Sequence, residues 1–238
     1  MLKRDKATAL KETQLFANLE ESSLLELAEV VREVRLKRGE ILFLVNEPAE
    51  KMFVIVSGSI RAFRVNAKGR EQVIHVERAG ATLAEVPVFD DGPYPATAAA
   101  EEDSVLLSLG RHDFKIICYQ HPEVAWATLR ILSARLRRHA ELVDELSLHD
   151  VGPRLAKYLL GEIDMEGQEH AEGICLNLQL THQQLASRIG SVREVISRTL
   201  TRLEKEGLIR LEGQVNGTSG YKVLILDRTS LEGYAAGL

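Results

Sequence analysis

Arginine and hydroxyl side chains recur at helical spacing near the C-terminal end of the chain, in the segment "SVREVISRTLTRLEKEGLI" (191–209). If this segment is a helix, its polar side chains share one face and its apolar side chains the opposite face. The guanidinium groups of Arg193 and Arg198 can each donate two hydrogen bonds to a guanine edge, and hydroxyl groups can contact bases or phosphates. The pattern predicts a helix that reads the DNA major groove, with Arg193 and Arg198 as its reading residues.

The surrounding segment adds further candidate contacts and a local positive charge. From Thr181 to Arg210 there are six Lys or Arg residues against three Glu, although the whole chain has a net charge of -5. Positive charge is thus concentrated where DNA phosphates would lie. Glu194 has two open interpretations, because it could cap the helix start beside Ser191 or accept a hydrogen bond from a base. The predicted DNA-binding residues are Thr181, Gln183, Ser191, Arg193, Glu194, Ser197, Arg198 and Arg202.

Two capping-box patterns predict that this segment contains two helices joined by a tight turn. Thr181 with Gln184, and Ser191 with Glu194, each pair a hydroxyl with an acid or amide three residues later. The two helix starts are therefore ten residues apart, and Gly190 supplies the turn between the helices. The side chains expected to be buried are Leu185, Ala186 and Ile189 on the first helix and Val192, Ile196, Leu200 and Leu203 on the second.

A glycine-rich stretch follows, after Gly207 ends the second helix. The segment "LIRLEGQVNGTSGYKVLIL" alternates apolar and polar residues on either side of a turn, which predicts a two-stranded wing with strands at 208–211 and 221–226. A helical hairpin with a polar, solvated face is the plain alternative to a DNA-binding unit. The corresponding alternative function is an effector-binding regulatory protein whose C-terminal domain contacts another protein.

The bulk composition is that of an ordinary globular protein. With 238 residues, 45% hydrophobic and 27% charged, the chain can form two modest domains. No apolar run approaches the roughly 20 residues of a membrane span, and the charged start lacks the apolar core of a signal peptide. We therefore expect a cytoplasmic protein that does not interact with membranes.

The sequence offers little support for catalysis or for a metal centre. No nucleophile and base pair, glycine-rich phosphate loop or metal-spaced set of carboxylates emerges from it, so no enzyme activity is expected. Cys118 and Cys175 are far apart in sequence and too few for a zinc ribbon or an iron–sulfur cluster. Both cysteines are expected to be buried thiols.

The N-terminal half is predicted to be mostly β. Residues 34–109 contain short apolar runs such as "MFVIVSG" and "SVLLSL" separated by turn residues, which is typical of a small antiparallel barrel or sandwich. Residues 111–120 then fit a short helix, His121–Pro122 interrupts it, and a long helical pattern runs from Glu123 to His149. The predicted division is a β domain at 1–122, a long helix at 123–149 and a DNA-binding domain at 150–238.

The long helix carries an apolar seam with the three-and-four spacing of a parallel coiled coil. A second line, through Trp126, Ala127, Ile131, Ala134 and Leu142, could face the β domain while the seam meets a partner. The pattern thus predicts a homodimer, and a single amphipathic helix packed on its own domain is the alternative. The seam residues are Leu129, Leu132, Leu136, His139, Val143 and Leu146.

The order of these elements resembles the bacterial Crp/Fnr transcription-regulator superfamily. The resemblance covers nearly the whole chain and includes "GSIRAFRVNAKGREQVIHVERAGATLAEVPVFDD", "HDVGPRLAKYLL" and "SVREVISRTLTRLEKEGLI". It implies an α+β fold with an N-terminal antiparallel β-roll of the cyclic-nucleotide-binding type (a double-stranded β-helix), a long dimerisation helix and a C-terminal winged helix-turn-helix. The implied function is a homodimeric transcription factor whose β-roll senses an effector.

The resemblance to the cyclic-AMP-binding branch fails at the phosphate cassette. That branch carries Gly-Glu, followed ten residues after the Glu by Arg-Ser or Arg-Thr, whereas here Ala84 precedes Glu85 and Pro95–Ala96 takes the place of the second pair. Residues 79–110 contain no Lys or Arg, so they offer no charge to balance a buried phosphate. Cyclic AMP is therefore not the expected effector. The candidate pocket residues are Glu85, Pro95, Ala96, Leu136, His139, Ala140 and Val143.

Other branches of the superfamily suggest other sensors. The oxygen-sensing branch needs several cysteines for its cluster, and this chain has two. The segment "TLAEVPVFDDGPYPATAAA" resembles instead the nitric-oxide-responsive branch, the dissimilatory nitrate respiration and hybrid-cluster-protein regulators, for which haem is the proposed sensor. His139 on the seam and His75 on a strand expected to line the roll are the candidate haem ligands, and a structural role for either is the alternative. Two His139 side chains paired across a twofold axis would also make an interface sensitive to pH.

The sequence predicts the DNA-binding site in more detail than the effector site. The resemblance carries the reading positions of the family to Arg193, Glu194 and Arg198, with Ser197 added. Arg193 donating to guanine and Glu194 accepting from cytosine fit a palindrome near TTGTGA-N6-TCACAA. The expected partners are double-stranded palindromic DNA, a second copy of the chain and, if the dimer activates transcription, RNA polymerase.

Overall fold

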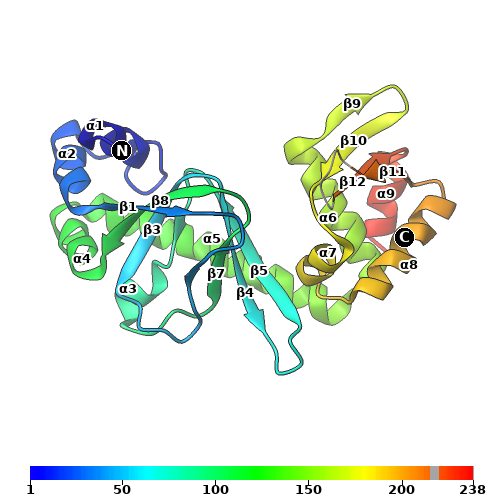
Figure 1. Ribbon diagram of the computed structural model, residues 1–238, viewed down its shortest axis with the longest axis horizontal. Coiled ribbons are helices and arrows are strands. Elements are labelled where there is room, and N and C mark those ends of the chain that lie inside the picture. The colour runs from blue at the N-terminus through cyan, green and yellow to red at the C-terminus, as the bar shows by residue number, and fades with distance from the viewer. Residues whose placement is uncertain (215–219, 238) are drawn as a thin grey trace. The chain divides into compact units, whose positions relative to one another are not determined.

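The computed structural model describes residues 1–214 and 220–237, which form two compact units (Figure 1). The first unit contains Met1–Asn66 and Val73–Ala140, and the second contains Ala67–Gln72 and Glu141–Leu238. Within the described residues, none of the helices combines the length and the apolar character that a membrane crossing requires.

The first unit is built on two four-stranded sheets with antiparallel pairing. In one sheet the order is β1-β8-β3-β6, and in the other it is β2-β7-β4-β5. The expected antiparallel β-roll is therefore confirmed. The strands of the first sheet are β1 (Arg32–Leu36), β3 (Lys51–Ser57), β6 (Thr82–Leu83) and β8 (Ser104–Gly110), and those of the second are β2 (Ile41–Phe43), β4 (Ser59–Val65), β5 (Glu71–Arg78) and β7 (Thr97–Ala100).

Strand β3 shows how the apolar runs of the sequence form this roll. Because successive side chains of a strand point to opposite faces, a strand covered on both sides needs apolar residues at every position. Phe53 and Ile55 of β3 point into the roll, whereas Met52 and Val54 pack against helices on the outer face. The continuous apolar run in the sequence is therefore a strand with two buried faces.

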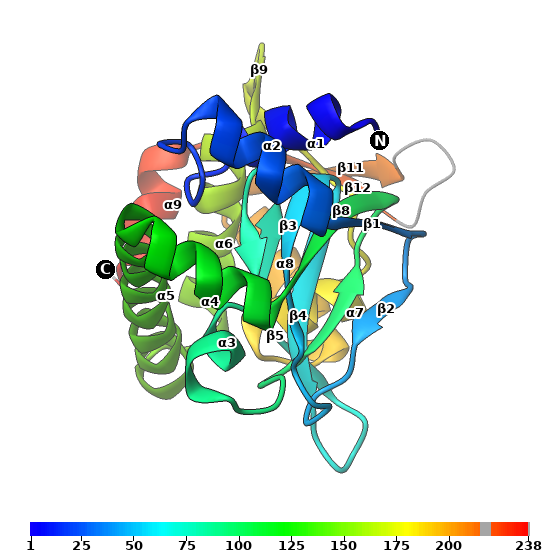
Figure 2. The same ribbon diagram turned by 90° about the vertical axis from the view of Figure 1, so that its left-hand side faces the viewer.

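Helices cover the outer face of this first sheet. They are α1 (Lys3–Lys11), α2 (Glu21–Val30), α4 (Arg111–Gln120) and the start of α5 (Pro122–Leu148), and a short helix α3 (Val86–Asp90) contacts α4. Figure 2 shows α4 and α5 in green beside the strands. Phe16 and Phe114 meet edge to face, with 6.4 Å between ring centroids. The predicted break at His121–Pro122 is confirmed as the boundary between α4 and α5.

Helix α5 has one buried face and one exposed apolar face. Val124 and Ala127 are buried against the roll, whereas Leu129, Leu136 and Val143 are 53%, 71% and 63% exposed. This exposed line carries most of the predicted seam, with Leu146 exposed and Leu132 and His139 half-buried.

The prediction that Trp126 faces the β domain is wrong. Its side chain is 67% exposed, although its neighbour Ala127 is buried. Val124, Ala127 and Ile131 follow helical spacing and set the inner face, so Trp126, one residue before Ala127, is turned about 100° away from it.

The second unit combines helices with a sheet of order β11-β12-β10-β9. Apolar side chains from helices and strands meet in one core, which includes Leu159, Leu176 and Leu200. Strands β11 and β12 confirm the predicted wing, and its tip at 215–219 lies outside the described residues. The elements are α6 (Val151–Glu166), β9 (Gln168–His170), β10 (Gly173–Leu178), α7 (His182–Ile189), α8 (Arg193–Lys205), β11 (Ile209–Gln214), β12 (Tyr221–Ile225) and α9 (Arg228–Ala235).

The helix-turn-helix forms as its first capping box predicts. Thr181 Oγ1 accepts a hydrogen bond of 3.1 Å from the Gln184 amide, and Gln184 Oε1 accepts one of 2.9 Å from the Thr181 amide. Gly190 has φ +72°, a left-handed conformation that glycine adopts without strain, and it turns the chain after α7. The side chains expected to point inward from α7 are buried.

The second predicted capping box is wrong. Helix α8 starts at Arg193, its N-cap is Val192, and no side chain caps it. The Ser191 amide donates to the Ala186 carbonyl, which places Ser191 in the turn and leaves its side chain buried. Val192, expected inward, is 40% exposed because it precedes the first helical turn, whereas Ile196, Leu200 and Leu203 are buried as predicted.

Thr181 caps a helix and Ser191 does not, and this difference should appear in the free energy of unfolding of their alanine variants. Thr181→Ala removes a side-chain acceptor from the start of α7 and should lower the free energy of unfolding by about 0.5–2 kcal/mol. Ser191→Ala removes no cap and should change it by less than about 0.5 kcal/mol. Urea denaturation of the two variants beside the wild type tests this, and equal losses would contradict the assignment of Val192 as the N-cap.

Candidate functional site

Helix α8 presents its polar face on the surface of the second unit. Arg193, Glu194 and Arg198 are exposed, Ser197 is half-buried, and the buried stripe lies on the other side of the helix. Arg193 forms no ion pair or hydrogen bond with its side chain in the part of the chain that the structure describes. Its guanidinium is therefore available to a ligand at the first turn of the helix.

The other residues predicted to contact DNA differ in whether their side chains already have partners within the protein. The guanidinium of Arg202 donates to the Tyr234 hydroxyl at 2.5 Å, forms an ion pair with Glu206 at 3.2 Å and lies over the Tyr234 ring. Thr181 uses its hydroxyl oxygen as the cap of α7, and Gln183 is exposed. Ser191 is buried, so the structure does not bring it onto the polar face of α8.

Arg135 on α5 forms the centre of a buried charged cluster in the first unit. Its guanidinium forms ion pairs with Glu77 on β5, at 3.2 Å, and with Glu85, and it also donates to the Thr82 carbonyl oxygen. All these side chains are buried, Glu85 completely. Burial alone would lower the pKa of Arg135, but the two carboxylates outweigh it and raise that pKa. Arg135 is thus a permanent cation held between two acids.

The sequence prediction included Glu85 but missed Arg135. The signal was present, because Arg135 follows Ile131 by four residues on the inner face of α5, where a charge needs a partner. Its partners could not be read from spacing, since Glu77 and Glu85 lie 58 and 50 residues away.

The two histidines predicted as haem ligands lie side by side. His75 on β5 and His139 on α5 have stacked rings with 5.9 Å between centroids. Both ring nitrogens of His75 are buried and have no hydrogen-bond partner. Burial, and then the nearby positive charge of Arg135, lower the pKa of His75 to about 4, so its ring is neutral near neutral pH.

The remaining candidate pocket residues are spread more widely. Ala96 is buried, Pro95 is exposed, and the Pro95 carbonyl oxygen accepts a hydrogen bond of 2.5 Å from Arg64 of β4. Ala84 has φ +66°, a left-handed conformation that costs an alanine about 1–2 kcal/mol. Leu136 and Ala140 are exposed on α5, as is Val143.

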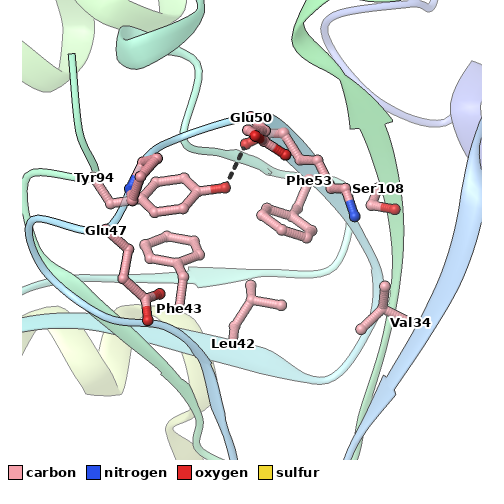
Figure 3. A pocket seen from close by; sticks show the side chains of 10 residues that line it. Val34, Leu42, Phe43, Glu47, Glu50, Phe53, Tyr94 and Ser108 are labelled. Atoms are coloured by element: carbon pink, nitrogen blue, oxygen red, sulfur yellow. Dashed lines mark hydrogen bonds between the residues drawn. The ribbon is translucent and has the colours of Figure 1, made fainter.

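The roll also has a hollow of about 320 Å³, lined by aromatic, aliphatic and charged side chains (Figure 3). Phe43 stacks between Tyr94 and Phe53, with centroid separations of 3.8 and 5.8 Å. The Tyr94 hydroxyl donates to the Lys51 carbonyl oxygen at 3.0 Å, and the Ser108 hydroxyl also has a backbone partner. Glu47, Glu50 and Lys51 also line the hollow, so its walls are partly apolar and partly charged.

Metal ligands do not gather in either unit. Within residues 1–214 and 220–237, no group of three or more His, Cys, Asp or Glu side chains could hold a metal ion. The described thiols, Cys118 and Cys175, are both free and half-buried, less buried than expected from the sequence. Burial raises the pKa of Cys118 to about 11, so that thiol is protonated near neutral pH.

Comparison with known proteins agrees with this architecture. A model of the cyclic nucleotide-binding domain matches residues 33–121, and a model of the Crp-like helix-turn-helix domain matches residues 153–234. The cyclic AMP receptor protein of Thermus thermophilus is 30% identical over 174 residues, which are 73% of this chain and 77% of that protein. The chain belongs to the Crp/Fnr family of transcriptional regulators.

Other members of the Crp/Fnr family are similar over most of the chain. The CRP-like cAMP-activated global transcriptional regulator of Mycobacterium tuberculosis is 28% identical over 200 residues, covering 84% of this chain and 89% of that protein. The structure of a CooA mutant from Carboxydothermus hydrogenoformans covers 93% of this chain and 94% of its own, with a TM-score of 0.76 and 22% identity. The protein is thus a DNA-binding regulator of the Crp/Fnr type with a cyclic nucleotide-binding domain.

His75, whose ring nitrogens are buried and whose ring is neutral near neutral pH, should make the stability of the protein depend on pH. The pKa of this histidine is about 4 in the folded protein against 6.5 as the ordinary value. Between these values the unfolded chain binds more protons, so stability rises with pH and is lost as pH falls through this window. We expect the free energy of unfolding to drop by about 1–2 kcal/mol between about pH 7 and pH 5 on account of this residue.

Substitution isolates this contribution. In His75→Phe the drop between the two pH values should be smaller by that amount, because phenylalanine does not titrate. The substitution breaks no hydrogen bond among the described residues, because the ring nitrogens of His75 have no partner there. His170→Phe, which changes an exposed histidine, should keep the wild-type dependence. If urea denaturation gives the same drop for His75→Phe as for the wild type, His75 is not neutral in the folded state.

Proposed function

We propose that the protein is a homodimeric, sequence-specific DNA-binding transcription regulator controlled by an effector that binds in the β-roll. DNA binding is supported chiefly by the first turn of α8. There the side chain of Arg193 is exposed and makes no ion pair or hydrogen bond with a described residue, and the buried apolar side chains lie on the opposite face of the helix. Arg193 and Arg198 read the major groove, and Glu194 and Ser197 add contacts. Because Val192 rather than Ser191 is the N-cap, Glu194 is not needed as a capping partner and can accept a hydrogen bond from a base.

The dimer forms through the exposed apolar line of α5. Leu129, Leu136 and Val143 recur every seven residues, and large apolar side chains that are mostly exposed in one chain are the pattern of a coiled-coil seam. A twofold dimer places two copies of α8 about one duplex turn apart and requires a palindromic site. The proposed site is near TTGTGA-N6-TCACAA, and RNA polymerase is the further partner if the dimer activates transcription.

Arg193→Ala should weaken binding to this palindrome by about 1–3 kcal/mol for each half-site, because each half-site loses one bidentate base contact. Preference for the guanine it reads should relax at the same time. Competition gel shifts with the palindrome and with single-base variants measure both effects. Arg4→Ala, an exposed arginine on α1, serves as control and should bind like the wild type.

Two outcomes would contradict this assignment. Unchanged affinity and base preference in Arg193→Ala would remove Arg193 from the reading residues. Binding to DNA should also weaken steeply as salt rises, because phosphate contacts release counterions. A C-terminal domain that contacts protein instead would give no salt-dependent gel shift with any duplex.

The effector is proposed to be a molecule other than cyclic AMP, although the names of similar regulators from Mycobacterium tuberculosis and Thermus thermophilus refer to that ligand. Pro95–Ala96 replaces the Arg-Ser pair that would meet a phosphate. Arg135, although buried in the roll, already neutralises part of the charge of Glu77 and Glu85. An anionic ligand would therefore have to displace two carboxylates.

A haem-based nitric oxide sensor is a second candidate, favoured by the contact between His75 and His139. An axial histidine binds haem iron through a ring nitrogen, and both ring nitrogens of His75 lack a hydrogen-bond partner among the described residues. Titration of the wild type, His75→Ala and His139→Ala with haem should give a stoichiometric Soret band that one substitution removes, and absence of a band in the wild type would end this hypothesis.

A further inference from the structure

A second cavity in the first unit lies between α5, the turn after β5 and the segment that follows α1. Its volume is about 360 Å³, enough for a small metabolite. Its polar lining includes Glu12, Gln14, Thr82, Arg135 and Arg138. The candidate pocket residues Glu85, Pro95, Ala96, Leu136, His139, Ala140 and Val143 are not among those that line it.

The charged groups on the floor of this cavity are paired, and Arg135 there contacts two carboxylates, Glu77 and Glu85. Arg135 and Glu77 form their ion pair there, with 3.2 Å between Nε and Oε1. Beside them is the Thr82 side chain, which is 2% exposed and whose buried Oγ1 has no hydrogen-bond partner among the described residues.

The rim of the cavity has one acidic and one basic side chain, Glu12 and Arg138, without ion-pair partners among the described residues. Glu12, just after α1, and Arg138 on α5 are both exposed and both line the cavity. Neither side chain takes part in an ion pair or hydrogen bond with another described residue. Gln14 adds an amide that can donate and accept.

This arrangement discriminates between classes of ligand. A simple anion would meet Glu12 and Glu77, and a simple cation would meet Arg138 and Arg135, so either would be partly repelled. A molecule with one ammonium and one carboxylate group can satisfy both sides of the rim.

We propose that this cavity binds a small zwitterion of the α-amino acid type. Its carboxylate contacts Arg138, and its ammonium group contacts Glu12. The ligand bridges the segment after α1 and the helix α5, on the outer side of the Arg135 ion pair. The site is independent of the proposed DNA contacts and of the ligand in the roll.

Isothermal titration of the full-length protein, without DNA, tests the proposal with defined probes. L-serine and L-glutamine carry both charges, L-serine methyl ester lacks the carboxylate, and 3-hydroxypropanoate lacks the ammonium group. We expect at least one amino acid to bind below about 10 mM, and each single-charge analogue of serine to bind about tenfold or more weakly than serine. No heat with either amino acid, or equal binding of the analogues, would overturn the proposal.

Matched variants locate the site. Arg138→Gln and Glu12→Gln should each weaken the binding amino acid about fivefold or more, because each removes one charge partner. Arg137→Gln and Glu20→Gln change exposed neighbours that do not line the cavity and should bind like the wild type. Thermal unfolding of all four variants without ligand verifies folding. Binding that is unchanged in both rim variants would overturn the proposal, and gel shifts of the same variants report separately on the DNA-binding function.

Discussion

The buried guanidinium of Arg135 is the interaction on which the first unit depends. Removing a charge from water costs several kcal/mol, and the cost is recovered only when partners are close and well oriented. Glu77, Glu85 and the Thr82 carbonyl oxygen provide those partners and fix the inner face of α5 against the roll. With that face fixed, Leu129 and Leu136 point outward and give α5 an exposed apolar face.

The same cluster lies beside two histidines and beside one cavity. His75 and His139 stack near Arg135, whose charge helps to keep His75 neutral. On its other side, Arg135 forms the floor of the cavity that also contains Arg138. Both groups of side chains include residues of α5, the helix that carries the proposed dimer seam.

The second unit follows more directly from local sequence. The Thr181 cap, the left-handed Gly190 and the spacing of Ile196, Leu200 and Leu203 are features of adjacent residues, and each was predicted as the structure has it. The error at Ser191 also has a local cause. The Ser191 amide donates to the Ala186 carbonyl oxygen, so Ser191 belongs to the turn after α7, and α8 begins at Arg193. A capping motif by itself does not show where the preceding turn ends.

The sequence by itself determined the β-roll, the long helix, the winged helix-turn-helix and the family, because strand and helix periodicity and turn residues act over a few positions. It also drew attention to Glu85, His75 and His139 individually. Only the tertiary structure decided that these residues surround Arg135, that Trp126 is exposed and that Arg202 is held by Tyr234. The physical reason is that buried charges choose partners by distance in space, and the partners of Arg135 are at least 50 residues away in sequence.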